Sequence, residues 1–116
     1  MRQIQRLPDD DLTSGASCNG LSNVVSQIDT VLAQVPGEAD GLDWHWLARM
    51  KNGKYVYITG SCDYTGWDCQ SWMKHWYGSS VEKVLRFVKE DNEKKSIRTQ
   101  LFHQVTGDQP YGLREL

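Results

Sequence analysis

Residues 44–59 read WHWLARMKNGKYVYIT, and this stretch decides the fold. Asn52-Gly53 lies between two runs rich in aromatic and β-branched residues, which is a strong short-range signal for a β-hairpin. A type I′ turn needs positive φ at both central positions, and Asn and Gly tolerate that conformation best. We therefore predict an antiparallel hairpin over residues 43–61.

The expected turn also fixes which side chains share a face of the hairpin. With those two residues as the loop, Met50 faces Tyr55 and Trp46 faces Thr59. Successive side chains of a strand point to opposite faces. One face is then expected to carry Trp44, Trp46, Ala48, Met50, Tyr55 and Tyr57. The other is expected to carry His45, Leu47, Arg49, Val56 and Ile58. Neither set is plainly polar, so we expect both faces to be at least partly covered.

On the N-terminal side of the hairpin, the pattern favours a helix over residues 21–35. Apolar residues follow one-face helical spacing there, with Asn19 as the expected N-cap and Pro36-Gly37 as the stop. Residues 1–20 have little periodicity, and we expect an irregular N-terminal arm.

On the C-terminal side, residues 70–77 fit the spacing of either a strand or a short helix. We favour a third strand or extended arm, because a two-stranded hairpin alone is marginal. Ser79 and Glu82 predict a capping box for a helix over residues 79–90. Apolar spacing then resumes at Ile97, Leu101 and Val105, and residues 108–116 are expected to be an irregular tail. The predicted fold class is α+β, with a single domain over residues 1–116. It is a hairpin or three-stranded meander packed with an N-terminal helix and one or two C-terminal helices.

Composition places the chain among ordinary cytoplasmic proteins. It has 116 residues, a formal net charge of −2 and no basic stripe of the kind that binds duplex nucleic acid. No apolar run approaches a membrane span, and the N-terminus lacks a signal-peptide apolar region. Three cysteines are too few for a disulfide scaffold. We therefore expect a soluble protein with no membrane association.

The aromatic residues are concentrated in one part of the chain. Residues 44–77 hold all five tryptophans, and one small core cannot easily bury that many. Without a catalytic motif, this surplus favours a non-enzymatic module that needs no cofactor and binds another protein through residues 62–77. A phage-encoded antagonist of a host system is one concrete version. The expected contact residues are Asp63, Tyr64, Trp67, Asp68, Trp72 and Trp76.

A small cysteine- and histidine-based enzyme or metal protein is the alternative. Cys62, Cys69, His45 and His75 supply ligand types for a metal, although their spacing is not that of a usual zinc site. The expected register places Cys62 on the same face as His45. Either cysteine could instead be a nucleophile beside a histidine, and a disulfide between the two is a further option.

Asp63 and Asp68 allow two interpretations. They could act as an acid–base pair, orient an imidazole or bind a cation. Aspartates in a glycine-containing turn more often accept hydrogen bonds from nearby backbone amides, and we favour that interpretation.

A single-stranded nucleic acid binder is the second alternative. Trp44, Trp46, Tyr55 and Tyr57 resemble a stacking platform in composition. Such platforms accompany a positive groove, whereas the few basic residues near this one are offset by aspartates. We therefore expect these four side chains to be core residues.

Overall fold

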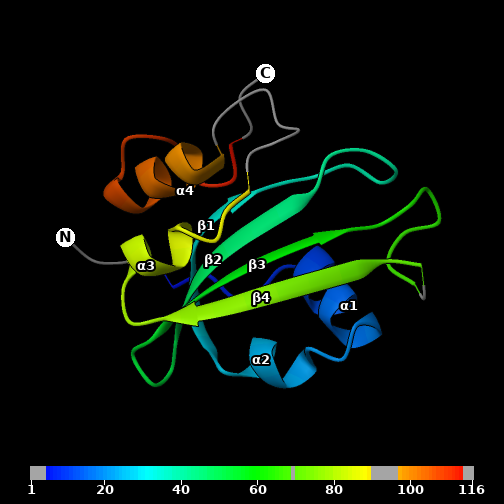
Figure 1. Ribbon diagram of the computed structural model, residues 1–116, viewed down its shortest axis with the longest axis horizontal. Helices are drawn as coiled ribbons and strands as arrows, with labels where there is room; N and C mark the ends of the chain where they lie inside the picture. The colour runs from blue at the N-terminus through cyan, green and yellow to red at the C-terminus, as the bar shows by residue number, and fades with distance from the viewer. Residues whose placement is uncertain (1–4, 69, 90–96, 114–116) are drawn as a thin grey trace.

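The computed structural model describes residues 5–68, 70–89 and 97–113. Its elements, in chain order, are α1 (Asp10–Cys18), α2 (Ser22–Ser26), β1 (Ile28–Val35), β2 (Trp44–Met50), β3 (Tyr55–Ser61), β4 (Trp72–Gly78), α3 (Val81–Leu85) and α4 (Ile97–Thr106). The four strands form one antiparallel sheet in the order β1-β2-β3-β4 (Figure 1). The class is α+β, as predicted, with one strand more than the expected meander. Within the described residues, no helix combines the length and apolar character needed to cross a membrane.

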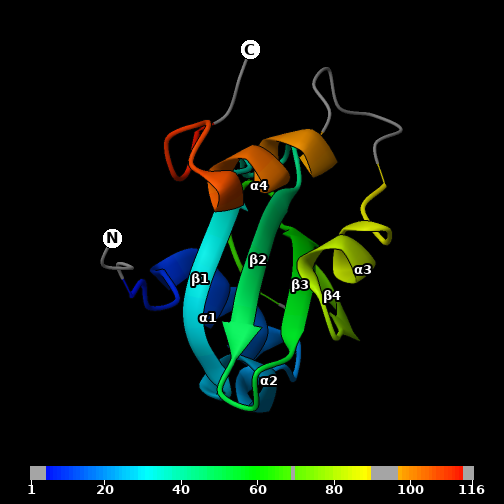
Figure 2. The ribbon, with the colours of Figure 1, turned by 90° about the vertical axis from the view of Figure 1, so that its left-hand side faces the viewer.

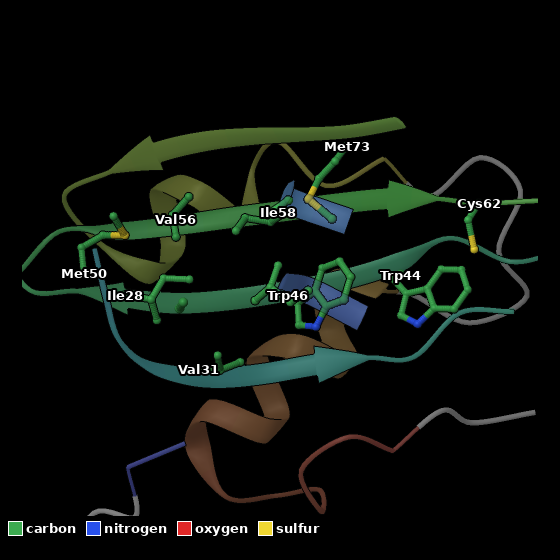
Figure 3. Packing of buried hydrophobic residues seen from close by; sticks show 12 residues of the cluster. Ile28, Val31, Trp44, Trp46, Met50, Val56, Ile58, Cys62 and Met73 are labelled. Carbon is green, nitrogen blue, oxygen red and sulfur yellow. The ribbon is translucent and has the colours of Figure 1, made fainter. Parts of the chain in front are cut away.

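Helices cover both faces of the sheet (Figure 2). On one side, the α1–α2 face, the buried core contains Leu12, Ala16, Ile28, Val31, Trp44, Trp46, Ala48, Met50, Val56, Ile58, Cys62 and Met73 (Figure 3). On the other side, the α3–α4 face, it contains Ala33, Val35, Leu47, Tyr57, Val84, Leu85, Val88, Ile97 and Leu101. The sheet therefore separates two apolar clusters, each closed by helices from one end of the chain.

The hairpin is confirmed, but its register is shifted by one residue from the prediction. Trp46 pairs with Ile58, and Leu47 pairs with Tyr57. The loop has three residues, 51–53, because the Met50 amide donates to the Lys54 carbonyl at 2.7 Å. Within this loop, positive φ occurs at Gly53 alone, at 85°, which fits a type I turn followed by a left-handed glycine.

This shift exchanges side chains between the two faces. Tyr57 joins His45 and Leu47 on the α3–α4 face, while Val56 and Ile58 join the tryptophans of β2 on the other face. A shift of one residue reverses the facing of a whole strand, because side chains alternate with a period of two. The expectation that both faces are covered is confirmed.

The predicted helix over residues 21–35 is wrong for most of its length. Only α2 is helical, and residues 28–35 form β1, paired with β2. The register of β1 shifts twice, between Ile28 and Thr30 and between Val31 and Ala33. These bulges interrupt the alternation and leave Ile28 and Val31 in the same cluster, three residues apart. The bulges in this strand thus place apolar residues at the three-residue spacing that is typical of a helix.

The expected irregular N-terminal arm is also wrong, because residues 10–18 form α1. The Asp9 carboxylate caps this helix by accepting a hydrogen bond from the Leu12 amide at 2.9 Å. Leu12 and Ala16, one turn apart, are fully buried against the sheet. This helix is short, and only a few of its side chains are buried. The sequence therefore shows only a weak helical periodicity here.

The C-terminal predictions are confirmed in outline. β4 is the expected third strand of the meander, and Gly107, with φ of 89°, follows the last residue of α4. The helix predicted over residues 79–90 is shorter, since α3 ends at Leu85 and its N-cap is Ser80, one residue after the expected cap. The charged stretch at residues 90–96 lies outside the described residues.

The outer edge of β1 is closed by hydrogen bonds from both ends of the chain. The Arg6 carbonyl accepts from the Val31 amide, and the Arg6 amide donates to the Thr30 hydroxyl, both at 2.8 Å. The Gln104 side chain imitates a neighbouring strand. Its Oε1 accepts from the Gln34 amide at 2.9 Å, and its Nε2 donates to the Gln34 carbonyl at 2.8 Å. The edge is therefore protected from pairing with another chain.

Gln100 and Gln104 lie one turn apart on α4, and they differ in the hydrogen bonding of their side-chain amides. Gln104 makes the two bonds to β1 and a third, accepted from the Gly112 amide at 3.0 Å. Gln100 is 2% exposed, and its amide group has no hydrogen-bond partner among the described residues. A buried amide without partners costs about 1–3 kcal/mol.

We predict that Gln100→Met raises the free energy of unfolding by about 1 kcal/mol, because an apolar side chain removes the desolvation cost. Gln104→Met should lower it by about 1–3 kcal/mol, because it leaves the β1 backbone groups without partners. Urea denaturation of both variants measures the difference. Destabilisation by both substitutions would contradict the assignment of Gln100 as an unsatisfied group.

Candidate functional site

The loop between β3 and β4 is organised around Trp67, which points inward. Its ring lies 5.1 Å from the ring of Trp44 and 6.4 Å from that of Trp46, between centroids. Its Nε1 donates to the Asp11 carboxylate of α1 at 3.1 Å. A Cβ at Gly60 would lie 3.1 Å from the same ring, so glycine gives it room above β3. Three of the five tryptophans therefore build one cluster on the α1–α2 face.

Asp63 and Asp68 organise the same loop. The Asp63 carboxylate accepts from the Thr65 amide, and the Asp68 carboxylate accepts from the Gln70 amide, each at 2.9 Å. The Thr65 hydroxyl lies between the two carboxylates and hydrogen-bonds with them. The bonds from Thr65 and Gln70 lower the pKa of Asp68. The favoured interpretation, local hydrogen bonding in a turn, is confirmed, and Tyr64 stands exposed at the tip.

The expected pairing of Cys62 with His45 is wrong, because the sheet separates them. Cys62 is buried beside Trp44 on the α1–α2 face (Figure 3), whereas His45 lies with Tyr57 on the other face. The one-residue change of register accounts for this separation. His75 is half-buried in β4, and Cys69 lies outside the described residues. Across the described ranges, no three His, Cys, Asp or Glu side chains are grouped as a metal site requires.

A pocket of about 180 Å³ opens on the α3–α4 face, between β4 and the segment that follows α3. Its innermost side chains are His45, Tyr57 and Thr59, with exposed fractions of 3%, 1% and 8%. His45 Nδ1 lies 2.8 Å from the Tyr57 hydroxyl, and the two rings are nearly parallel. The Thr59 hydroxyl donates to the Trp44 carbonyl at 2.8 Å. These contacts make the floor of the pocket polar and fixed in place.

Aromatic side chains form the wall of the pocket. Tyr57, Trp76 and Phe87 stack in sequence, with centroid distances of 5.4 Å and 5.7 Å and interplanar angles of 15° and 13°. Trp72 stands on the same face of β4 as Trp76 and is 39% exposed. Tyr57 is fully buried, so the ladder runs from the core of the sheet outward to Phe87, which is 44% exposed.

Charged side chains complete the lining. Lys74 and Lys89 are exposed, and Asp43 is half-buried. Lys74 alternates with Trp72 and Trp76 along β4, and its Nζ lies 5.6 Å from the centre of the Trp72 ring. Among the described lining residues, two ammonium groups stand against one carboxylate, an excess of positive charge.

The outer edge of β4 differs from that of β1. β4 pairs with β3 along its whole length without a register shift, from Ser61 opposite Trp72 to Tyr55 opposite Gly78. Among the residues that the structure describes, no further backbone hydrogen bond reaches β4. The sheet therefore has one edge closed by the chain itself and one edge whose outward backbone groups have no partner among the described residues.

No known protein family, curated protein or solved structure matches this chain. The pocket and the open edge of β4 therefore carry the functional assignment by their geometry. Of the expected contact residues, Trp72 and Trp76 lie at this site, whereas Trp67 packs into the core and Asp63 and Asp68 hold the loop.

Sequence reasoning did not group the other side chains of the pocket. His45 and Tyr57 were considered only in other roles, as a metal ligand and as part of a stacking platform. The remaining lining residues were missed, and they are Asp43, Thr59, Lys74, Phe87 and Lys89. The correct register would have indicated part of this set, since Tyr57 faces Trp76 across the β3–β4 ladder. Phe87 follows α3 and approaches the strand only in the folded chain, so no local pattern marks it.

We predict that Trp67→Ala lowers the free energy of unfolding by about 2–3 kcal/mol, because it removes a half-buried ring from the tryptophan cluster. Tyr64→Ala, which truncates an exposed aromatic residue three positions earlier, should change it by less than about 0.5 kcal/mol. Chemical denaturation followed by circular dichroism compares the two. Equal effects would show that Trp67 is not a core residue.

The two described cysteines are expected to differ in reactivity. Burial, followed by the nearby carboxylates of Asp11, Asp63 and Asp68, raises the pKa of the Cys62 thiol and so reduces its thiolate fraction at neutral pH. Cys18 is exposed. We predict alkylation of Cys62 by iodoacetamide at least about ten-fold slower than that of Cys18, measured by peptide mass mapping. Unfolding in urea should bring the two rates together, and equal rates in the native protein would contradict the burial of Cys62.

Proposed function

We propose that this chain is a non-enzymatic binding protein that captures an extended segment of another protein along β4. The observation that carries the proposal is the contrast between the two edges of the sheet. Strand addition at an exposed edge is a common mode of peptide recognition, in which backbone hydrogen bonds supply affinity and side-chain pockets supply specificity.

β4 lacks most devices that proteins use to protect an exposed edge. Such devices include bulges, prolines, charged side chains and covering segments. β1 has two bulges and is covered from both ends of the chain. β4 has a regular ladder, no proline and one charged residue, Lys74. An unprotected seven-residue edge suits a strand that pairs with a partner.

The side chains of β4 supply contacts on both sides of the added strand. Trp72, on the α3–α4 face, and Tyr77, on the other, are 39% and 49% exposed. Tryptophan and tyrosine are enriched among the residues that dominate binding energy. The pocket beside Trp76 can receive one anchoring side chain of the partner. These features support a protein partner better than a nucleic acid, because Trp44, Trp46 and Tyr57 of the hairpin are at most 7% exposed and offer no stacking platform.

Selection of a random peptide library on the intact immobilised protein tests this proposal. We expect enriched peptides to shift the amide resonances of residues 72–78 in NMR spectra. Trp72→Ala should weaken their binding about ten-fold or more while leaving the thermal midpoint almost unchanged. Tyr64→Ala, an exposed aromatic residue away from the strand, is the matched control and should bind normally. Peptides that map elsewhere, or no enrichment, would refute strand capture at β4.

A further inference from the structure

We infer that the pocket on the α3–α4 face is a binding site for a single planar ring that carries a carboxylate. The inference goes beyond strand capture, because it assigns a small-molecule ligand of its own to the pocket, which strand capture uses only to receive a side chain of the partner. It is argued from the size of the pocket, its aromatic wall, its buried polar floor and its charge.

The size of the pocket limits the ligand to one ring with a small substituent. Sites for drug-sized ligands and cofactors occupy about 300–1,000 Å³. This pocket has about 180 Å³, which is too small for a dinucleotide or flavin. A ligand with one ring is therefore the largest that fits within this pocket.

The wall favours a planar ligand. Trp76 stacks with Tyr57 and with Phe87, and the rings in each pair are within about 15° of parallel. The stack is anchored in the core, because Tyr57 is 1% exposed and its hydroxyl is held by His45. Rings that are already ordered lose little conformational freedom when a ligand ring packs against them. Aromatic pairs in such geometries gain free energy beyond that of buried area.

The floor is built as a polar site rather than as a gap between apolar side chains. His45, Tyr57 and Thr59 are each more than nine-tenths buried, and each carries a group that can form hydrogen bonds. A few fixed polar groups inside an aromatic pocket are the usual means by which a small ligand is oriented.

The charges select an anion. Among the described lining residues, Lys74 and Lys89 carry positive charges and Asp43 carries the one negative charge. Lys74 is held at 5.6 Å from the centre of the Trp72 ring, so its charge lies beside the aromatic wall. A carboxylate attached to a stacked ring can thus meet an ammonium group without leaving the wall. A cationic ring would meet two like charges.

Three probes of one shape and different charge test the inference on the full chain: benzoate, benzamide and benzamidine. NMR titration should show benzoate binding most tightly and benzamidine least, with shifts at His45, Thr59 and Trp76. Lys74→Gln and Lys89→Gln should each weaken benzoate binding about three- to five-fold and leave benzamide unchanged, since exposed charge pairs contribute modestly. Lys51→Gln, on the exposed hairpin loop, is the control and should change neither.

A second variant tests the wall. Phe87→Leu removes an exposed ring of the stack and should weaken benzoate and benzamide binding alike, while dispersed NMR spectra report a folded chain. Benzamidine binding as tightly as benzoate, shifts confined to other residues, or no binding by any probe would each overturn the inference. Peptide capture at β4 is measured separately, so either proposal can fail while the other stands.

Discussion

The left-handed glycine at position 53 is the constraint on which the rest of the structure depends. It allows a three-residue loop in which the Met50 amide reaches the Lys54 carbonyl, and that bond sets the register of the central strands. A side chain at this position would carry the cost of positive φ, which glycine avoids. A two-residue loop would have moved Tyr57 to the opposite face of the sheet.

The register decides the composition of both apolar clusters. It places Tyr57 between Leu47 on one side and Trp76 on the other, and so starts the aromatic stack of the pocket. It places Gly60 opposite Trp44, where the absence of a side chain gives Trp67 space above the strand. The loop after β3 folds over the sheet because that space exists. The tryptophan-rich stretch is thereby divided into a largely buried cluster under α1 and a more exposed one beside β4.

The sequence was sufficient for the fold class, for the hairpin and for β4, because turn residues and runs of β-formers act locally. It was insufficient for β1, where two bulges make Ile28 and Val31 recur at helical spacing. It was also insufficient for the pocket, whose wall joins Tyr57, Trp76 and Phe87 from three separate segments. Trp72 and Trp76, which line the pocket, could be selected as candidate contact residues from composition. Which side chains lie next to these two tryptophans depends on the register of the hairpin. Asn-Gly is compatible with a two-residue and a three-residue loop, and the register differs by one residue between them.

The open edge and the pocket lie side by side. Every second residue of β4, namely Trp72, Lys74 and Trp76, points to the face that holds the pocket. A segment that pairs with the edge of β4 lies beside the pocket mouth, and one of its side chains can enter. Binding would lose little conformational entropy in the protein, because the site is already ordered before the partner arrives. Trp76 is stacked on Tyr57, and the ladder between β3 and β4 is regular. Closure of the β1 edge by Gln104 and Arg6 leaves β4 as the edge where an added strand meets no competing hydrogen bond from the described chain. The asymmetry of the sheet thus leaves its open edge on the side where the exposed tryptophan lies, which is where we propose that a partner strand binds.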